Sequence, residues 1–117
     1  MKYILIAFGG AIGALLRVVI SESLYKVSFF SIPLGIISVN IIGCFLVGIF
    51  YDSLSDKFHA FIVLGFLGAF TTFSAFSRET LELLNKGEIV LAFLYVLISV
   101  LLCLLSTWIG ILVRSGT

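Results

Sequence analysis

Long uncharged runs separate the few charged residues of this 117-residue chain, and they restrict its fold more than any other feature. Three runs cover residues 27–51, 58–77 and 89–113, and a fourth, residues 3–21, is interrupted only by Arg17. A helix that crosses the hydrocarbon core of a bilayer needs roughly 20 apolar residues. The sequence therefore predicts an all-α integral membrane protein with four transmembrane helices. We place the spans at about residues 3–24, 32–51, 58–84 and 88–113, within a single domain of residues 1–117.

The composition argues against most other classes of protein. Hydrophobic residues make up 62% of the chain and charged residues 11%, whereas an ordinary soluble domain has about 25% charged residues. A soluble monomer of this size could not bury so much apolar surface. The scarcity of charge also argues against disorder and against nucleic-acid binding. The two cysteines, Cys44 and Cys103, are too few for a disulfide framework or a metal site, and we interpret them as packing residues.

Positive charges are spread almost evenly over the two sides of the predicted bundle. With the N-terminus inside, Lys2, Lys57 and Arg114 lie on the inner side and Lys26 and Lys86 on the outer, and two more arginines lie at span ends. The positive-inside rule orients a membrane protein through a clear excess on one side. We therefore expect insertion in both orientations, so that one sequence could form an antiparallel dimer. The alternative is that one or two charges, or a partner, still fix one orientation.

Small residues recur at helical spacing in the first span. Gly9 and Gly13 form a G-x-x-x-G pair, and Gly10 and Ala14 repeat the spacing on an adjacent stripe. Small residues at this spacing let transmembrane helices approach closely. A four-helix protomer of this size encloses little space, so we expect any pathway through it to require a second copy.

Polar residues in the middle of the predicted spans point to function. Asn40 lies one residue from the centre of the run 27–51, where an amide is costly unless it bonds to a partner or faces water. An interhelical hydrogen bond is the simpler interpretation of an isolated asparagine.

The third span predicts a helix break near Gly68–Thr72. Glycine loosens a helix, and the serines and threonines that follow compete for its backbone hydrogen bonds. Irregular backbone at this depth occurs only where it is buried in protein or lines a cavity. Carbonyls freed by such a break could bind a small cation. Phe73 and Phe76 share a face after the break, and their positive ring edges could face an anion, although such a pair is usually plain packing.

Three motifs, in order along the chain, resemble those of the Fluc/CrcB fluoride channel family. The first two are Gly9-Gly10-x-x-Gly13-Ala14-x-x-Arg17 and Pro33-Leu34-Gly35-x-x-x-Val39-Asn40-x-x-Gly43. The third is the segment Gly65–Thr80, with its Thr-Thr-Phe-Ser-x-Phe-Ser. The resemblance covers essentially the whole chain. It implies a multi-pass channel of the cell membrane, not an enzyme, that passes fluoride passively out of the cell.

The resemblance also implies an assembly and roles for individual residues. The assembly would be a dual-topology antiparallel dimer in membrane lipid, with two pores, formed by a second copy or by a paralogous subunit. A structural sodium ion at its centre would be bound by the main-chain carbonyls of Gly68 and Thr71 from each subunit. Arg17 would lie near an aqueous vestibule. The ion pathway would be lined by Asn40, Phe73, Ser74, Phe76, Glu79, Tyr95 and Ser99.

Three positions depart from the family pattern. Ile36 stands where threonine usually follows glycine in the second motif, Ala69 replaces a glycine beside the break, and Ala75 replaces a threonine between the two phenylalanines. The last change removes a hydroxyl, so we expect a polar track that is shorter or partly supported by water. The sodium ligands are backbone atoms and are unaffected.

The chemistry of fluoride suits these residues. Fluoride is small, strongly hydrated and a hydrogen-bond acceptor, so conduction requires donors that replace its water shell without holding it too tightly. Asn40, the hydroxyls and the phenylalanine edges are such donors, and a central cation would offset the cost of an anion at this depth.

Two other functions fit the hydrophobicity of the chain. A small proton-coupled drug exporter would need a carboxylate buried within a span, but the first span has no acid before Glu22 and the third has none before Glu79. A non-transporting membrane anchor would leave Asn40 and the polar break unexplained.

Overall fold

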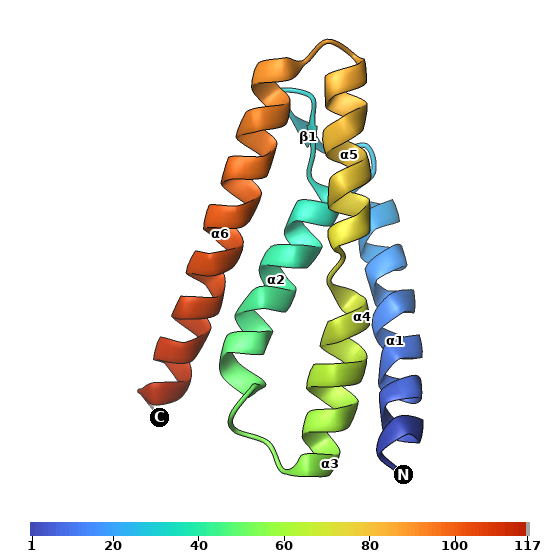
Figure 1. Ribbon diagram of the computed structural model, residues 1–117, viewed down its shortest axis with the longest axis vertical. Coiled ribbons are helices and arrows are strands. Elements are labelled where there is room, and N and C mark those ends of the chain that lie inside the picture. The colour runs from blue at the N-terminus through green and yellow to red at the C-terminus, as the bar shows by residue number, and fades with distance from the viewer. Residues whose placement is uncertain (117) are drawn as a thin grey trace.

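The computed structural model describes residues 1–116 and consists of helices with one small hairpin (Figure 1). The N-terminus and the C-terminal end of α6 lie at the same end as α3, and the hairpin and the α5–α6 connection lie at the other. The elements, in chain order, are α1 (Lys2–Ser23), β1 (Ser28–Phe29), β2 (Ile32–Pro33), α2 (Gly35–Phe50), α3 (Asp56–Phe58), η1 (His59–Leu67), α4 (Gly68–Phe70), α5 (Phe73–Asn85) and α6 (Ile89–Ser115).

Three helical stretches are long and apolar enough to cross a membrane: α1, the composite helix Asp56–Asn85, and α6. The helix α2 is also apolar but has 16 residues, and at 1.5 Å per residue it is about 24 Å long. The chain is therefore a helical membrane protein with three helices of spanning length and one shorter apolar helix.

The second span begins later than the sequence predicts, and the fold is not purely helical. Ile32 and Pro33, placed at the start of that span, form strand β2, which pairs antiparallel with β1 in the register Ser28↔Pro33 and Phe29↔Ile32. Proline disfavours the helical conformation of the residue before it, so Ile32 is extended and α2 starts only at Gly35. The hairpin turn holds Phe30 and Ser31 at φ values of 52° and 71°, as a two-residue turn of the primed type requires.

The third span is broken, as the sequence predicts. Thr71 (φ −79°, ψ 153°) and Thr72 (φ −148°, ψ 117°) are extended and separate α4 from α5. The break lies at the C-terminal end of the predicted segment, and the preceding turns, in η1, are wound as a π-helix. Gly68 itself is helical (φ −62°, ψ −33°), so the backbone departs from the helix at the threonines.

Close helix packing confirms the role predicted for Gly9 and Gly13. A Cβ atom at Gly9 would overlap the carbonyl oxygen of Phe61, and one at Gly13 would overlap that of Phe66, because α1 lies directly against η1. The pair α2 and α6 is equally close. There a Cβ atom on Gly48 or on Gly110 would overlap a backbone carbonyl oxygen of the facing helix.

The buried core lies on the hairpin side of the break. It joins α2, α5 and α6 around Phe76 and Tyr95, and it includes Ile36, one of the departures from the family pattern. Large apolar side chains are exposed along most of α1 and α6. Such extensive apolar surface suits a protein whose surroundings are lipid and other helices.

Candidate functional site

The amide of Asn40 bridges the break in the third span. Its Nδ2 donates to the carbonyl oxygen of Thr72 over 3.1 Å, and its Oδ1 accepts from the amide of Thr72 over 2.8 Å. A side-chain amide thus satisfies both backbone groups of an extended residue, which would otherwise be costly to bury. Since the amide nitrogen carries two protons, one N–H of Asn40 is left for another acceptor.

These bonds deprive two carbonyls of their helical donors. In a continuous helix the amide of Thr72 would donate to Gly68 and that of Ala75 to Thr71. Here the Thr72 amide donates to Asn40, and the Ala75 amide donates to the hydroxyl of Thr72 over 3.1 Å, which caps α5. The carbonyls of Gly68 and Thr71, the two predicted sodium ligands, are therefore released from regular helical bonding.

The released carbonyls fit a hard cation in their chemistry but not in their number. Hard cations bind oxygen ligands and take several of them at once. No group of three or more His, Cys, Asp or Glu that could hold a metal ion occurs among residues 1–116. One protomer offers the Gly68 and Thr71 carbonyls, so a complete site would need further ligands from elsewhere.

A cavity of about 250 Å³ lies beside the break and brings together four of the predicted pathway residues. These are Asn40 from α2, Phe73 and Phe76 from α5, and Ser99 from α6. Ser99 is 6% exposed, and its Oγ is one of the buried side-chain atoms without a hydrogen-bond partner within residues 1–116. A buried hydroxyl without a partner is costly, so the Ser99 hydroxyl is available to donate to an acceptor in this cavity.

Aromatic rings of α5 and α6 continue from the cavity toward the hairpin end. The ring centroids of Phe73 and Phe76 are 5.4 Å apart, as are those of Phe76 and Tyr95. Tyr95 is fully buried, and its hydroxyl donates to the carboxylate of Glu79 over 2.5 Å. The Tyr95 hydroxyl is thus engaged by Glu79 and does not line the cavity.

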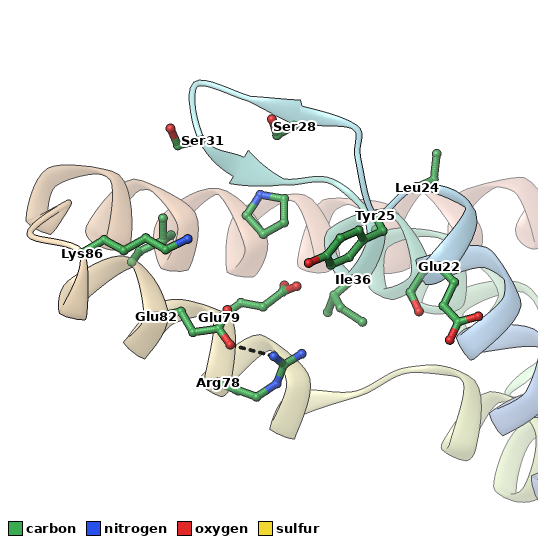
Figure 2. Close-up of a pocket in the computed structure, with 14 residues that line it drawn as sticks. Glu22, Leu24, Tyr25, Ser28, Ser31, Ile36, Arg78, Glu79, Glu82 and Lys86 are labelled. Atoms are coloured by element: carbon green, nitrogen blue, oxygen red, sulfur yellow. Dashed lines mark hydrogen bonds and ion pairs between the residues drawn. The ribbon is translucent and has the colours of Figure 1, made fainter.

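Glu79 belongs to a second, more polar hollow of about 510 Å³ at the hairpin end. Figure 2 shows Glu79 and Tyr25 pointing into it from opposite sides, with Arg78 and Glu82 joined by a 2.7 Å ion pair along α5. One helical turn separates Phe76, in the first cavity, from Glu79, in the second. The two hollows are therefore consecutive along α5.

Ser74 and Arg17 also lie apart from these hollows. The hydroxyl of Ser74 is exposed and lies 3.2 Å from the hydroxyl of Thr72. Arg17 donates from Nε to the carbonyl of Ala69 over 3.2 Å, at the end of α4. Arg17 thus supports the break from α1, and its place near a vestibule stays a prediction.

The cavity is also lined by residues for which the sequence predicts no functional role. Cys44 and Cys103, interpreted as packing residues, line the same cavity as Asn40 and Ser99. The sequence does indicate this placement through helical spacing. Each cysteine follows one of those polar residues by four positions and so lies on the same helix face. Thr72 also lines the cavity, and its role as cap and bonding partner of Asn40 depends on a contact between distant segments.

Comparison with known proteins agrees with the sequence motifs. A family model described as CrcB-like protein, Camphor Resistance (CrcB), matches residues 4–111. A relative from Geobacter sp. (strain M21) is 43% identical, with 98% of each chain covered. A relative from Campylobacter lari is 44% identical, with 92% of this chain and 93% of the relative covered. Both are named fluoride-specific ion channel FluC, which is not the name of an enzyme.

Sequence, fold and relatives agree on where the protein resides. The three helices of spanning length and the near-complete coverage of the relatives identify a multi-pass protein of the cell membrane. With the family model matching residues 4–111 and relatives more than 40% identical over almost the whole chain, the protein belongs to the CrcB-like family.

Proposed function

We propose that this chain is the protomer of a fluoride-specific channel that passes fluoride passively across the cell membrane and lowers its toxic level inside the cell. The names of the relatives support fluoride as the ion. The cavity beside the break supports a pathway for it, because its polar lining is composed of neutral groups and no charged side chain is among its lining residues.

The observation that carries the proposal is the buried Ser99 hydroxyl. It faces the cavity without a partner among the described residues, close to Asn40, which has one N–H to spare. Fluoride is an acceptor that needs strong but neutral donors, since a fixed positive charge would hold it too tightly. Two neutral donors and the edges of Phe73 and Phe76 fit that requirement.

The functional unit is an antiparallel dimer of two copies, or of this chain with a paralogous subunit. The protomer is 19 Å across its thinnest dimension, which is less than two helix diameters of about 10–12 Å. Phe73 is 79% exposed although it lies beside the cavity. A second copy would cover this ring and close the cavity into a pore.

A structural sodium ion completes the dimer centre. Its ligands are the carbonyls of Gly68 and Thr71 from both subunits, four oxygens in all. Each subunit alone supplies too few oxygens for a hard cation, and this links the cation to dimer formation. The ion supplies a fixed positive charge at mid-membrane that lowers the cost of an anion nearby.

Flux from proteoliposomes tests the proposal. Vesicles loaded with potassium fluoride should release fluoride when valinomycin allows potassium to follow, whereas vesicles loaded with potassium chloride should release no measurable chloride. Protein-free vesicles give the background. Absence of fluoride release would contradict the channel, and proton-dependent uptake of an aromatic cation would instead indicate the exporter.

The serine that carries the proposal has a matched control on the same helix. Ser99→Ala removes one neutral donor, a hydrogen bond worth about 0.5–1.5 kcal/mol, and should lower fluoride flux by about 2- to 10-fold. Ser106→Ala makes the same change on α6, outside the cavity lining, and should leave flux unchanged. Equal flux in both variants would remove Ser99 from the pathway.

A further inference from the structure

Two thiols face the same cavity from different helices. Cys44 on α2 and Cys103 on α6 both line the 250 Å³ cavity, and both are free and half-buried. The helices that carry them, α2 and α6, pack in direct backbone contact nearby, where a Cβ atom on Gly110 would overlap the carbonyl oxygen of Phe45. The two thiols therefore share one small cavity, although the two residues are far apart in the sequence.

The backbone on either side holds the two thiols in place. The hydroxyl of Thr107 lies 3.1 Å from the carbonyl oxygen of Cys44 and 3.1 Å from that of Cys103. One turn farther along α2, Gly48 packs so closely on α6 that a Cβ atom would overlap the Thr107 carbonyl. A ligand that binds both thiols thus meets a preformed pair and has little ordering to overcome.

We propose that Cys44 and Cys103 form a two-thiolate chelating site for a soft, two-coordinate metal ion such as Hg(II). Thiolates are soft ligands and select soft metals. Binding displaces both thiol protons to solvent, forms two metal–sulfur bonds and requires no oxidant or reductant. A divalent ion between two thiolates is neutral overall, and neutrality suits a site where net charge is costly to bury.

The surroundings of the pair disfavour other thiol-binding metals. Structural zinc sites take four protein ligands, usually cysteine and histidine. The chain has two cysteines and one histidine, and the histidine, His59, lies at the start of η1 in a different hollow of the molecule. Two thiolates without further protein ligands match an ion that prefers linear two-coordination.

A metal held here would obstruct the proposed fluoride pathway. Cys103 follows Ser99 by one helical turn and Cys44 follows Asn40 by one turn, and all four line the cavity. This consequence rests on the proposed function, whereas metal binding itself does not.

Retention of mercury by the purified protein tests the site directly. The full chain in detergent, freed of reductant, is loaded with one equivalent of mercuric chloride and challenged with excess of a monothiol, and bound metal is measured by intact mass spectrometry. Linking two ligands typically raises overall affinity by a factor of about 10²–10⁴. We expect the wild-type chain to retain one ion at monothiol concentrations at least about 100-fold above those that strip either single variant.

The cysteines offer a complete set of matched variants, because the chain has no others. Cys44→Ser and Cys103→Ser should each lose the tightly held ion, and the double variant should bind none. Cys44→Ala and Cys103→Ala repeat the comparison should serine disturb the fold, which elution volume and helical circular dichroism report. Retention by a single variant equal to the wild type, or two ions per wild-type chain, would overturn the proposal.

Mixed assemblies test whether the chelate lies within one chain. Cys44→Ser and Cys103→Ser chains, co-expressed and purified together, should not regain tight retention, because no chain then carries both thiols. Regained retention would place the pair between chains and overturn the site described. In the flux assay, mercuric chloride should block fluoride release by the wild type, whereas the double variant should release fluoride at the same rate with and without mercuric chloride, whatever that rate is. If the protein retains mercury but shows no fluoride flux even without mercury, the proposed channel is contradicted and the metal site is not. If fluoride flux continues while the mercury ion stays bound, the proposal that the ion obstructs the pathway is overturned.

Discussion

Asn40 shows how one side chain sets both the backbone and the chemistry of the site. Its amide replaces the helical bonds that Thr72 gives up, with contacts of 2.8 and 3.1 Å. By drawing the Thr72 amide away from Gly68, it also releases the carbonyl proposed to bind sodium. The interhelical bond and the pathway donor are therefore compatible roles for Asn40, because its Nδ2 carries two protons.

Replacing Asn40 by aspartate tests this bridge. Asn40→Asp loses the Nδ2 donor and sets a carboxylate oxygen against the Thr72 carbonyl. An unsatisfied buried group costs about 1–3 kcal/mol, so thermal unfolding in detergent should show a destabilisation of this size, with reduced fluoride flux. The exposed Asn85, at the end of α5, provides the control, since Asn85→Asp should change neither. A fully stable, fully conducting Asn40→Asp protein would contradict the bridge.

Phe73 allows the pathway to be tested without disturbing the protomer core. It is 79% exposed, so Phe73→Ile removes little buried surface. The loss of its ring edge, with aromatic contacts worth about 0.5–1.5 kcal/mol, should lower fluoride flux by about 2- to 10-fold. Phe93→Ile alters a comparably exposed ring on α6, 72% exposed, and should conduct normally. Equal flux in both proteins would take Phe73 out of the pathway.

The break divides the third span into two half-helices whose opposite ends meet near the middle of the span. The segment η1–α4 ends there with free carbonyls, which favour a cation, and α5 begins there with its amides, which favour an anion. Arg17 already bonds to one of those carbonyls, that of Ala69. This polarity supports a cation on one side of the break and an anion path on the other.

Two neighbouring glycines on α1, Gly9 and Gly10, allow the packing of α1 on η1 to be tested by substitution. Gly9→Ala would push a methyl group into the carbonyl oxygen of Phe61, so α1 and η1 must separate. We expect a destabilisation of about 1–3 kcal/mol, measured by thermal or denaturant unfolding in detergent. Gly10→Ala, at the next position, meets its nearest atoms at 3.8 and 3.9 Å and should be tolerated. Similar losses from both variants would show that α1 does not pack on η1 in this register.

At the scale of the whole molecule, charge at the two ends is nearly balanced. Lys57 lies near Lys2 at the end that carries the termini, where Arg114 is 3.7 Å from Asp52. Lys86 lines the hollow at the opposite, hairpin end together with Arg78 and three glutamates, Glu22, Glu79 and Glu82. Neither end has the excess of positive charge that would orient the chain, and this supports dual topology.

Added lysines should therefore control orientation. A C-terminal protease-sensitive tag on the wild-type chain should be cleaved to about one half in sealed inside-out vesicles. Ser53→Lys with Ser55→Lys adds charge at the terminal end and Ser23→Lys with Ser28→Lys at the hairpin end, so each pair should bias the chain to a single, opposite orientation. Each biased protein should lose fluoride flux, and co-expression of the two should restore it. Uniform cleavage of the wild-type tag, complete or absent, would contradict dual topology.

Sodium dependence tests the centre of the proposed dimer. Replacing sodium by N-methylglucamine should lower the temperature at which the dimer dissociates in detergent, because four carbonyls would then face each other without a cation. Gly68→Ala should keep the sodium response, since the ligand is a backbone oxygen and a Cβ atom there meets its nearest neighbour at 3.7 Å. A dimer of equal stability in both salts would argue against the ion.

Some departures from expectation have local causes that spacing does not encode. The start of α2 at Gly35 instead of Ile32 follows from Pro33, which keeps Ile32 extended, and from the turn at Phe30 and Ser31, which forms a hairpin where an apolar run predicts helix. The exact place of the break, at Thr71–Thr72 and not at Gly68, is stabilised by Asn40, a residue on another helix. The cavity role of Cys44 and Cys103 depends on the packing of α2 against α6.

The sequence by itself determined the solvent, the helical segments and the presence of a break, because each depends on the transfer of residues to lipid or on local backbone preference. Runs without charge specify spans, and glycine followed by hydroxyl residues specifies a weak point in a helix. Only the tertiary structure decided which polar groups are left without a hydrogen-bond partner. Whether the Ser99 hydroxyl, the second N–H of Asn40 and the Gly68 carbonyl are free depends on which distant atoms satisfy their neighbours, and a hydrogen bond between helices exists only once the helices are packed.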